Sequence, residues 1–198
     1  IVTYIAGYII ALAAPIMRQY LTLEPYYILH GQIWRLVSWI LIPPSSLDIF
    51  TIIMLFFYYS IGTSLERAWG DFKYNVYIFS GILMTIIGSF LLYGILYAVN
   101  GYPSLMGTAF STYYISLSIF LGFAISFPDM QVLLYFIIPI KIKYLAWLDA
   151  LLFLVGFIFG TWSARAAILF SLVNFFLFFG GDFFRGIKQN LQYRKRQK

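Results

Sequence analysis

The sequence predicts an all-α integral membrane protein, and its composition, its low charge and the length of its apolar runs support this prediction. Hydrophobic residues make up 62% of the 198 positions, and charged residues make up 10%. A soluble domain is about half apolar and about a quarter charged. Because a single soluble core cannot bury so much apolar surface, lipid must be the solvent for much of the chain. The length predicts one domain.

Six apolar runs are long enough, or nearly so, to cross a bilayer, which takes about 20 mainly apolar residues. The predicted helices cover residues 1–17, 47–65, 74–99, 105–127, 144–160 and 164–179. A charged loop is expected between the second and third helices. Ser45 or Ser46 is expected to cap the second helix, with Asp48 in its first turn.

Two other apolar runs are too short to span. Residues 36–42 lie in a long first loop and stop at Pro43, which favours a re-entrant or interfacial segment. Residues 132–140 are also short and end in Pro139 and a pair of lysines. Neither run is therefore predicted to be a transmembrane helix.

The distribution of basic residues predicts the orientation of the chain. Ten lysines and arginines fall on one side of the predicted helices, and three fall on the other. The ten are Arg67, Lys73, Lys141, Lys143 and the six of residues 185–198; the three are Arg18, Arg35 and Arg165. The more basic side is expected to be cytoplasmic, so both visible ends face the cytoplasm and the first loop faces outward. Residues 1–184 are then the transmembrane domain, and residues 185–198 are a basic cytoplasmic tail that meets anionic lipid, not nucleic acid.

The chain has few residues suited to metal or acid–base chemistry. It has no cysteine and a single histidine, His30. This excludes disulfides, thiolate metal sites and multi-histidine metal sites, so no metal and no cofactor is predicted. His30 lies in the first loop, where a local hydrogen bond is its expected role.

Short motifs resemble those of the rhomboid family. Trp34-Arg35 resembles the Trp-Arg motif of the rhomboid first loop, and Glu66-Arg67 followed by Gly70 is similar to the family's Glu-Arg-x-x-Gly at the end of helix two. Residues 127–140 resemble the helix 4–5 connection of many bacterial members. The resemblance implies a six-helix rhomboid-like bundle with a long outward-facing first loop, in a bacterial plasma membrane.

The same motif residues have structural roles without the family. Trp34 suits the membrane interface, and Arg35 can reach phosphates or loop carbonyls. Arg67 can satisfy the last carbonyls of a helix, Glu66 can pair with a cation, and Gly70 is suited to a C-terminal turn.

The residues that make rhomboids proteases are absent. Asn174 stands where the family places its histidine base, and an amide cannot accept a proton near neutral pH. Tyr113 lies near the nucleophile position, and Phe50 and Met54 stand where active members carry oxyanion donors. The resemblance is therefore to a catalytically inactive pseudoprotease.

The sequence thus predicts a non-proteolytic rhomboid-like protein that binds or escorts transmembrane segments of client proteins. The alternative is an intramembrane serine protease with a displaced nucleophile, Ser111, Ser116 or Ser118. A small transporter or channel is a third class, and it would need mid-membrane charges or paired broken helices. The client and the oligomeric state stay open.

Four residues inside the predicted helices carry further expectations. Gly156 and Gly160 form a Gly-x-x-x-Gly that suits close helix packing or dimerisation. Asn174 is expected to bond to another helix, for instance to a helix-four hydroxyl. Asp149 is expected near the cytoplasmic mouth of helix five, where its carboxylate would reach the interface.

Overall fold

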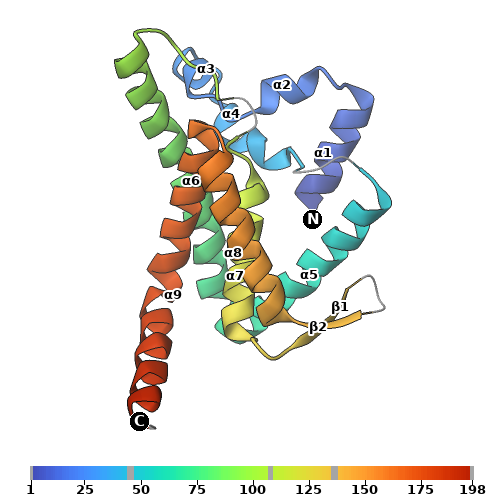
Figure 1. Ribbon diagram of the computed structural model, residues 1–198. Helices are drawn as coiled ribbons and strands as arrows, with labels where there is room; N and C mark the ends of the chain where they lie inside the picture. The colour runs from blue at the N-terminus through green and yellow to red at the C-terminus, as the bar shows by residue number, and fades with distance from the viewer. Residues whose placement is uncertain (1, 44–46, 107–108, 135–137, 197–198) are drawn as a thin grey trace.

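The computed structural model describes residues 2–43, 47–106, 109–134 and 138–196, and it is predominantly helical (Figure 1). Its helices are α1 (Val2–Ala13), α2 (Met17–Leu21), α3 (Pro25–Leu29), α4 (Arg35–Ser38), the 3-10 turn η1 (Trp39–Leu41), α5 (Ile49–Trp69), α6 (Asp71–Asn100), α7 (Thr112–Ser126), α8 (Ile142–Phe159) and α9 (Trp162–Arg196). Two short strands, β1 (Gln131–Leu134) and β2 (Ile138–Lys141), form an antiparallel hairpin in which Gln131 lies opposite Lys141.

Among the described residues, four helices are long and apolar enough to cross a membrane: α5, α6, α8 and the part Trp162–Gly180 of α9. The other two apolar helices are shorter, with 12 residues in α1 and 15 in α7. The predicted all-α membrane class is confirmed by these spans, whereas the count of six spans stays a prediction.

The helices α6, α7, α8 and α9 form the bundle (Figure 1). Tyr77 of α6 packs against Phe175 and Phe179 of α9, and Trp69 at the end of α5 joins this cluster. The Trp69 indole N–H also donates to the Ser126 hydroxyl of α7, 3.0 Å away. Aromatic packing and this hydrogen bond hold the C-terminal end of α5 to the bundle.

The charged loop predicted between the second and third helices does not exist. Only Gly70 separates α5 from α6, so Glu66 and Arg67 belong to the last turn of α5. Gly70 has φ 81° and ψ 155°, a backbone region that is essentially restricted to glycine. The chain can therefore reverse direction at one residue. Asp48 itself caps the start of α5, because its Oδ1 accepts from the Thr51 amide at 2.6 Å; Ser45 and Ser46 lie outside the described residues.

The fourth predicted helix starts later than expected, at Thr112 instead of residue 105. The Met106 amide donates to the Glu24 carboxylate at 2.9 Å, a contact between residues 82 positions apart. Met106 and Phe110 pack with Leu23 of the first loop in one apolar cluster. These apolar residues therefore belong to a loop that packs on protein, and α7 begins only after it.

The first loop is ordered by Arg35, whose side chain is 2% exposed. Its guanidinium donates to the carbonyls of Gln19 and Thr22, at 2.8 and 3.1 Å, and to the Gln32 side chain at 2.7 Å. The apolar run 36–42 forms the end of α4 and η1, where Trp39 is 1% exposed. Trp39 and Ile42 of this run thus pack within the protein, whereas Val37 is exposed.

The remaining predicted segments differ mainly at their ends. Residues 132–134 and 138–140 of the short run lie in the strands β1 and β2, beside which Asp129 is 3.9 Å from Lys141 and 3.8 Å from Lys143. Helix α9 continues as far as Arg196, so the backbone of residues 185–196 of the predicted tail is helical.

Candidate functional site

The first feature of the site is the divergence of α5 from the bundle. Of its buried residues, Ile61, Gly62 and Leu65 lie in the C-terminal half, which packs on α7 and α8, and Thr51 lies in the first turn. The N-terminal part, residues 49–56, points away from α6–α9 (Figure 1) and exposes Phe50 and Phe56. Helix α5 is therefore attached at one end and leaves an opening beside the bundle at the other.

A cavity of about 330 Å³ lies under α5, lined by residues from α1, η1, α5, α6 and α7. Its lining includes polar side chains, among them Tyr58, Glu66, Tyr74 and Thr112. A Cβ added at Gly62 would lie 2.7 Å from the Tyr74 hydroxyl oxygen, so glycine there leaves room for that ring. Polar side chains at membrane depth mark functional surfaces more often than structural ones.

One polar atom in this cavity lacks a partner. Thr112 is 6% exposed, and its hydroxyl has no hydrogen-bond partner among the described residues. A buried hydroxyl without a hydrogen bond costs about 1–3 kcal/mol. The cavity thus holds a donor and acceptor that the rest of the described chain does not use.

Asp149 of α8 is the second buried polar group at this side of the bundle. It is 4% exposed, and neither carboxylate oxygen has a hydrogen-bond partner among the described residues. It lies within electrostatic range of Tyr58 on α5 and Tyr113 on α7. The expectation that Asp149 reaches the interface was wrong, because its helix turns the carboxyl toward its neighbours.

The burial pattern of α8 accounts for this orientation of Asp149. The buried residues of α8 are Ile142, Asp149 and Phe153, which are spaced by seven and then four positions and so share one helical face. The positions of Tyr58 and Thr112 on the cavity carry no comparable signal, because they depend on how α5, α6 and α7 meet.

A separate groove of about 640 Å³ runs along α7, α8 and α9 and is almost entirely apolar. Ala124, Ala146 and Ala150 contribute small side chains to its lining, and Lys143 lies among the lining residues. A groove with this lining suits contact with lipid chains or with another helix.

The residues expected at degenerate catalytic positions lie in different settings. Asn174 is 1% exposed; its Oδ1 accepts from the Ser80 hydroxyl at 2.6 Å, and its Nδ2 donates to the Tyr77 carbonyl at 3.2 Å. It therefore bonds to another helix, but the partner is α6, not helix four. Phe50 and Met54 lie on the diverging half of α5, with exposed fractions of 56% and 48%. Tyr113 lies at the exposed start of α7.

The hydroxyls and the histidine considered for proteolysis have local partners. The Ser111 hydroxyl accepts from the Tyr113 amide at the start of α7, and Ser118 donates to the Ile115 carbonyl at 2.8 Å. His30 Nδ1 lies 2.7 Å from the Tyr26 carbonyl, in the first loop. Ser116 lines the cavity under α5.

The motif residues and glycines singled out in the sequence have structural contacts. The Trp34 side chain is half exposed and donates to the Tyr20 carbonyl at 3.2 Å, while Arg67 is exposed. A Cβ added at Gly156 would lie 3.1 Å from Ile168 of α9, and one at Gly160 would lie 3.1 Å from the Ala164 side chain. At these two glycines α8 thus approaches the start of α9 in the same chain.

The spans, the bundle and the polar cavity define a polytopic α-helical membrane protein. Residues 1–180 match the family described as eukaryotic integral membrane protein (DUF1751), and the chain belongs to this family. No curated protein and no solved structure matches the chain. The prediction of a bacterial rhomboid pseudoprotease in a bacterial plasma membrane was therefore wrong: the family is eukaryotic, and the match shows no link to rhomboids.

Proposed function

We propose that this chain binds transmembrane segments of client membrane proteins at the opening between α5 and the bundle, and so escorts them. The observation that carries the proposal is that α5 packs on the bundle from Phe57 onward, while its first residues diverge from α6–α9 and leave a cavity lined by Leu55 and Tyr58. An added helix in this opening would pack on the cavity-lining residues of α5, including Leu55 and Tyr58, and gain van der Waals contacts, which drive helix association in lipid.

The polar lining of the cavity supports a client as the occupant. Lipid chains offer no hydrogen bonds, and each unsatisfied polar group in hydrocarbon is costly. The Thr112 hydroxyl and the tyrosines Tyr58 and Tyr74 can instead bond to polar side chains of a transmembrane segment. Such bonds contribute about 0.6–2 kcal/mol each within a membrane.

The proposal is tested by photocrosslinking from two neighbouring positions of α5. Leu55 lines the cavity, whereas Phe56 is 71% exposed and is the matched control. Each is replaced by p-benzoylphenylalanine in the full chain, which is reconstituted in phosphatidylcholine vesicles with a synthetic Leu/Ala transmembrane helix of about 20 residues. Position 55 is expected to crosslink the helix several-fold more than position 56. Equal or weaker crosslinking from position 55 would overturn the proposal.

We also propose that the end of the bundle that carries Arg67, Lys73, Lys141 and Lys143 faces the cytoplasm, with residues 1–184 as the membrane domain and 185–198 as a cytoplasmic tail. The positive-inside rule supports this orientation. Because the chain has no cysteine, single cysteines can be placed at Asp129, whose side chain is 79% exposed, and at Ile33, which is 68% exposed. If the chain resides at the cell surface, an impermeant maleimide added to intact cells should label the cysteine at 33 and not the one at 129. If it resides in an internal membrane, sealed vesicles with the cytoplasmic face outward are used instead, and the cysteine at 129 should be labelled and the one at 33 should not. The opposite pattern contradicts the orientation.

A further inference from the structure

The carboxyl group of Asp149 is the polar group that the described fold satisfies least. The residue lies seven positions after Ile142, the first residue of α8, which places it about 10 Å along the helix axis. Its neighbours one turn away on the same face are Leu145 and Phe153, and both are apolar. Helix α8 therefore supplies no partner for a carboxylate that is 4% exposed and without a hydrogen bond among the described residues.

Within the described residues, the elements packed around Asp149 offer no opposite charge. The titratable groups that face it are Tyr58 of α5 and Tyr113 of α7, which are neutral near pH 7. The nearby basic residue of α8, Lys143, lies 3.8 Å from Asp129 at the end of the bundle. Both ion pairs within the described parts of the chain belong to Asp129. An acid in this setting is stabilised when a cation from outside the chain reaches it.

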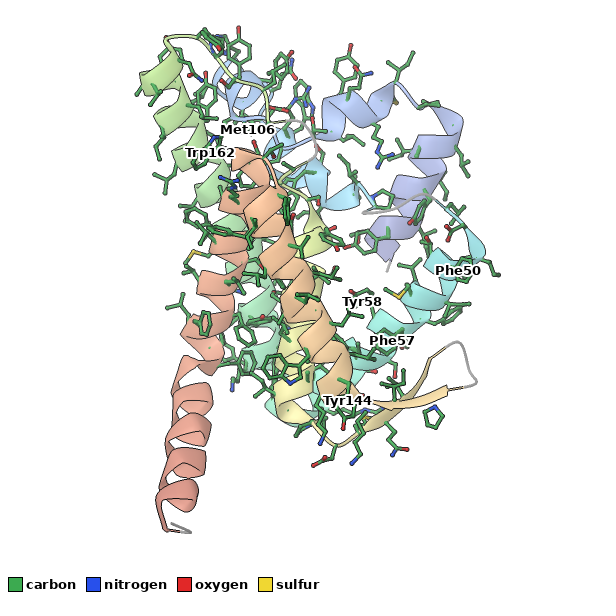
Figure 2. All side chains as sticks on the ribbon, in the orientation of Figure 1. Phe50, Phe57, Tyr58, Met106, Tyr144 and Trp162 are labelled. Carbon is green, nitrogen blue, oxygen red and sulfur yellow. The ribbon has the colours of Figure 1, made fainter. Side chains whose placement is uncertain are left out.

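The position of Tyr58 connects this acid to the opening under α5. Tyr58 lines the cavity and lies just before Ile61, where α5 joins the bundle. Figure 2 shows its side chain on α5 between the diverging half of that helix and α8. A small further separation of α5 from α8 around Tyr58 would therefore expose Asp149 to a segment that enters the opening.

We infer that Asp149 recognises a basic side chain, lysine or arginine, in the transmembrane segment of the client. This inference rests on the proposed function, since it needs a segment in the opening, and it adds the chemistry that selects the segment. The long apolar stem of lysine or arginine crosses hydrocarbon while its charged head pairs with the carboxylate. The pairing relieves an unpaired cation and an unpaired anion together, so both proteins gain from it.

The test compares two synthetic transmembrane helices that differ at one position. Both are Leu/Ala helices of about 20 residues, and one carries a single lysine about seven residues from the end that lies level with the start of α8. Binding of each to the full chain is measured by fluorescence energy transfer in phosphatidylcholine vesicles, which carry no net charge. The lysine helix is expected to bind on the order of tenfold more tightly than the all-apolar helix. Moving the lysine by four residues along its helix should remove most of the preference.

Variants locate the preference at Asp149. Asp149→Asn keeps the size of the side chain and should bring the ratio of the two affinities close to one, without weakening the apolar helix. Asp129→Asn is the matched control, an acid in a loop, and should leave the ratio unchanged. A charge exchange, Asp149→Lys with an aspartate in the helix, should restore the preference.

The outcomes separate this inference from the proposed function. If both helices bind equally to the unchanged chain, the role of Asp149 is refuted while the proposed function stands. If neither helix binds, both fail. The comparison of the two helices uses the unchanged chain, so it decides the inference even if Asp149→Asn does not fold.

Discussion

Asn174 gives the most direct test of how α9 is held to α6. Its side-chain amide makes two hydrogen bonds across the helix interface: Oδ1 accepts from the Ser80 hydroxyl at 2.6 Å, and Nδ2 donates to the Tyr77 carbonyl at 3.2 Å. A Cβ added at Gly81 would lie 3.2 Å from Nδ2, so the two helices approach closely here. The perturbation is Asn174→Ala, which removes both bonds and leaves the backbone unchanged.

The expected loss follows from these contacts. Hydrogen bonds between membrane helices average about 0.6 kcal/mol and reach about 1.7 kcal/mol. The Ser80 hydroxyl keeps its bond to the Tyr77 carbonyl at 3.0 Å, so the substitution leaves neither group unpaired. Two bonds and a small packing defect together predict a loss of about 1–3 kcal/mol in the free energy of unfolding.

The assay is reversible unfolding of the full chain in mixed micelles by titration with sodium dodecyl sulfate. Val173→Ala is the control, because Val173 lies beside Asn174 and is 45% exposed; it should change the free energy by less than about 0.5 kcal/mol. In a double-mutant cycle, Asn174→Ala and Ser80→Ala should show a coupling of about 0.6–1.7 kcal/mol. A loss no greater than that of the control, or a coupling of zero, would refute this account of the interface.

Three further predictions follow from single residues. Gly70→Ala should lower the free energy of unfolding by about 1–3 kcal/mol, because φ 81° and ψ 155° suit only glycine. Gly94→Ala, at a helical site with open space around it, should raise the free energy of unfolding by about 0.5–1 kcal/mol. The unfolding titration measures both changes. The hydrogen bond from the Thr51 amide lowers the pKa of Asp48. The stabilisation by this cap is therefore present above about pH 4 and is lost as pH falls through the lowered folded-state pKa. Hydrogen exchange of the Thr51 amide should accelerate in that acid range, and Asp48→Asn should abolish this acid dependence. A fluorophosphonate probe should not label Ser118, which is 1% exposed and hydrogen-bonded to its own helix. Mass spectrometry of the treated chain checks this prediction. Labelling that is abolished by Ser118→Ala would contradict it and would support a serine hydrolase.

The helix boundaries show where local sequence information was sufficient. Helix α8 begins two residues before its predicted start, and α6 ends one residue after its predicted end, at Asn100. Apolar run length and a glycine at the end are local properties, and Gly101 indeed closes α6 with φ 74°. The junction of α5 and α6 was predicted as a loop because charges cluster there, although one glycine is enough to reverse the chain.

The start of α7 shows where local information failed. Residues 105–111 continue an apolar pattern, so the sequence predicts helix. The structure instead uses the Met106 amide to bind Glu24, and it packs Phe110 with the first loop. No pattern within the run could indicate this, because the partners lie in the first loop.

The amino-acid sequence by itself determined that this chain resides in a membrane and which runs form its long helices, because composition and the length of apolar runs are local properties that lipid and the backbone act on directly. Only the tertiary structure decided that α5 diverges from the bundle, that Asn174 bonds to α6 and that Asp149 faces inward without a partner. These features depend on contacts between distant segments, and the energy of such contacts is set by which helices meet and at what angle.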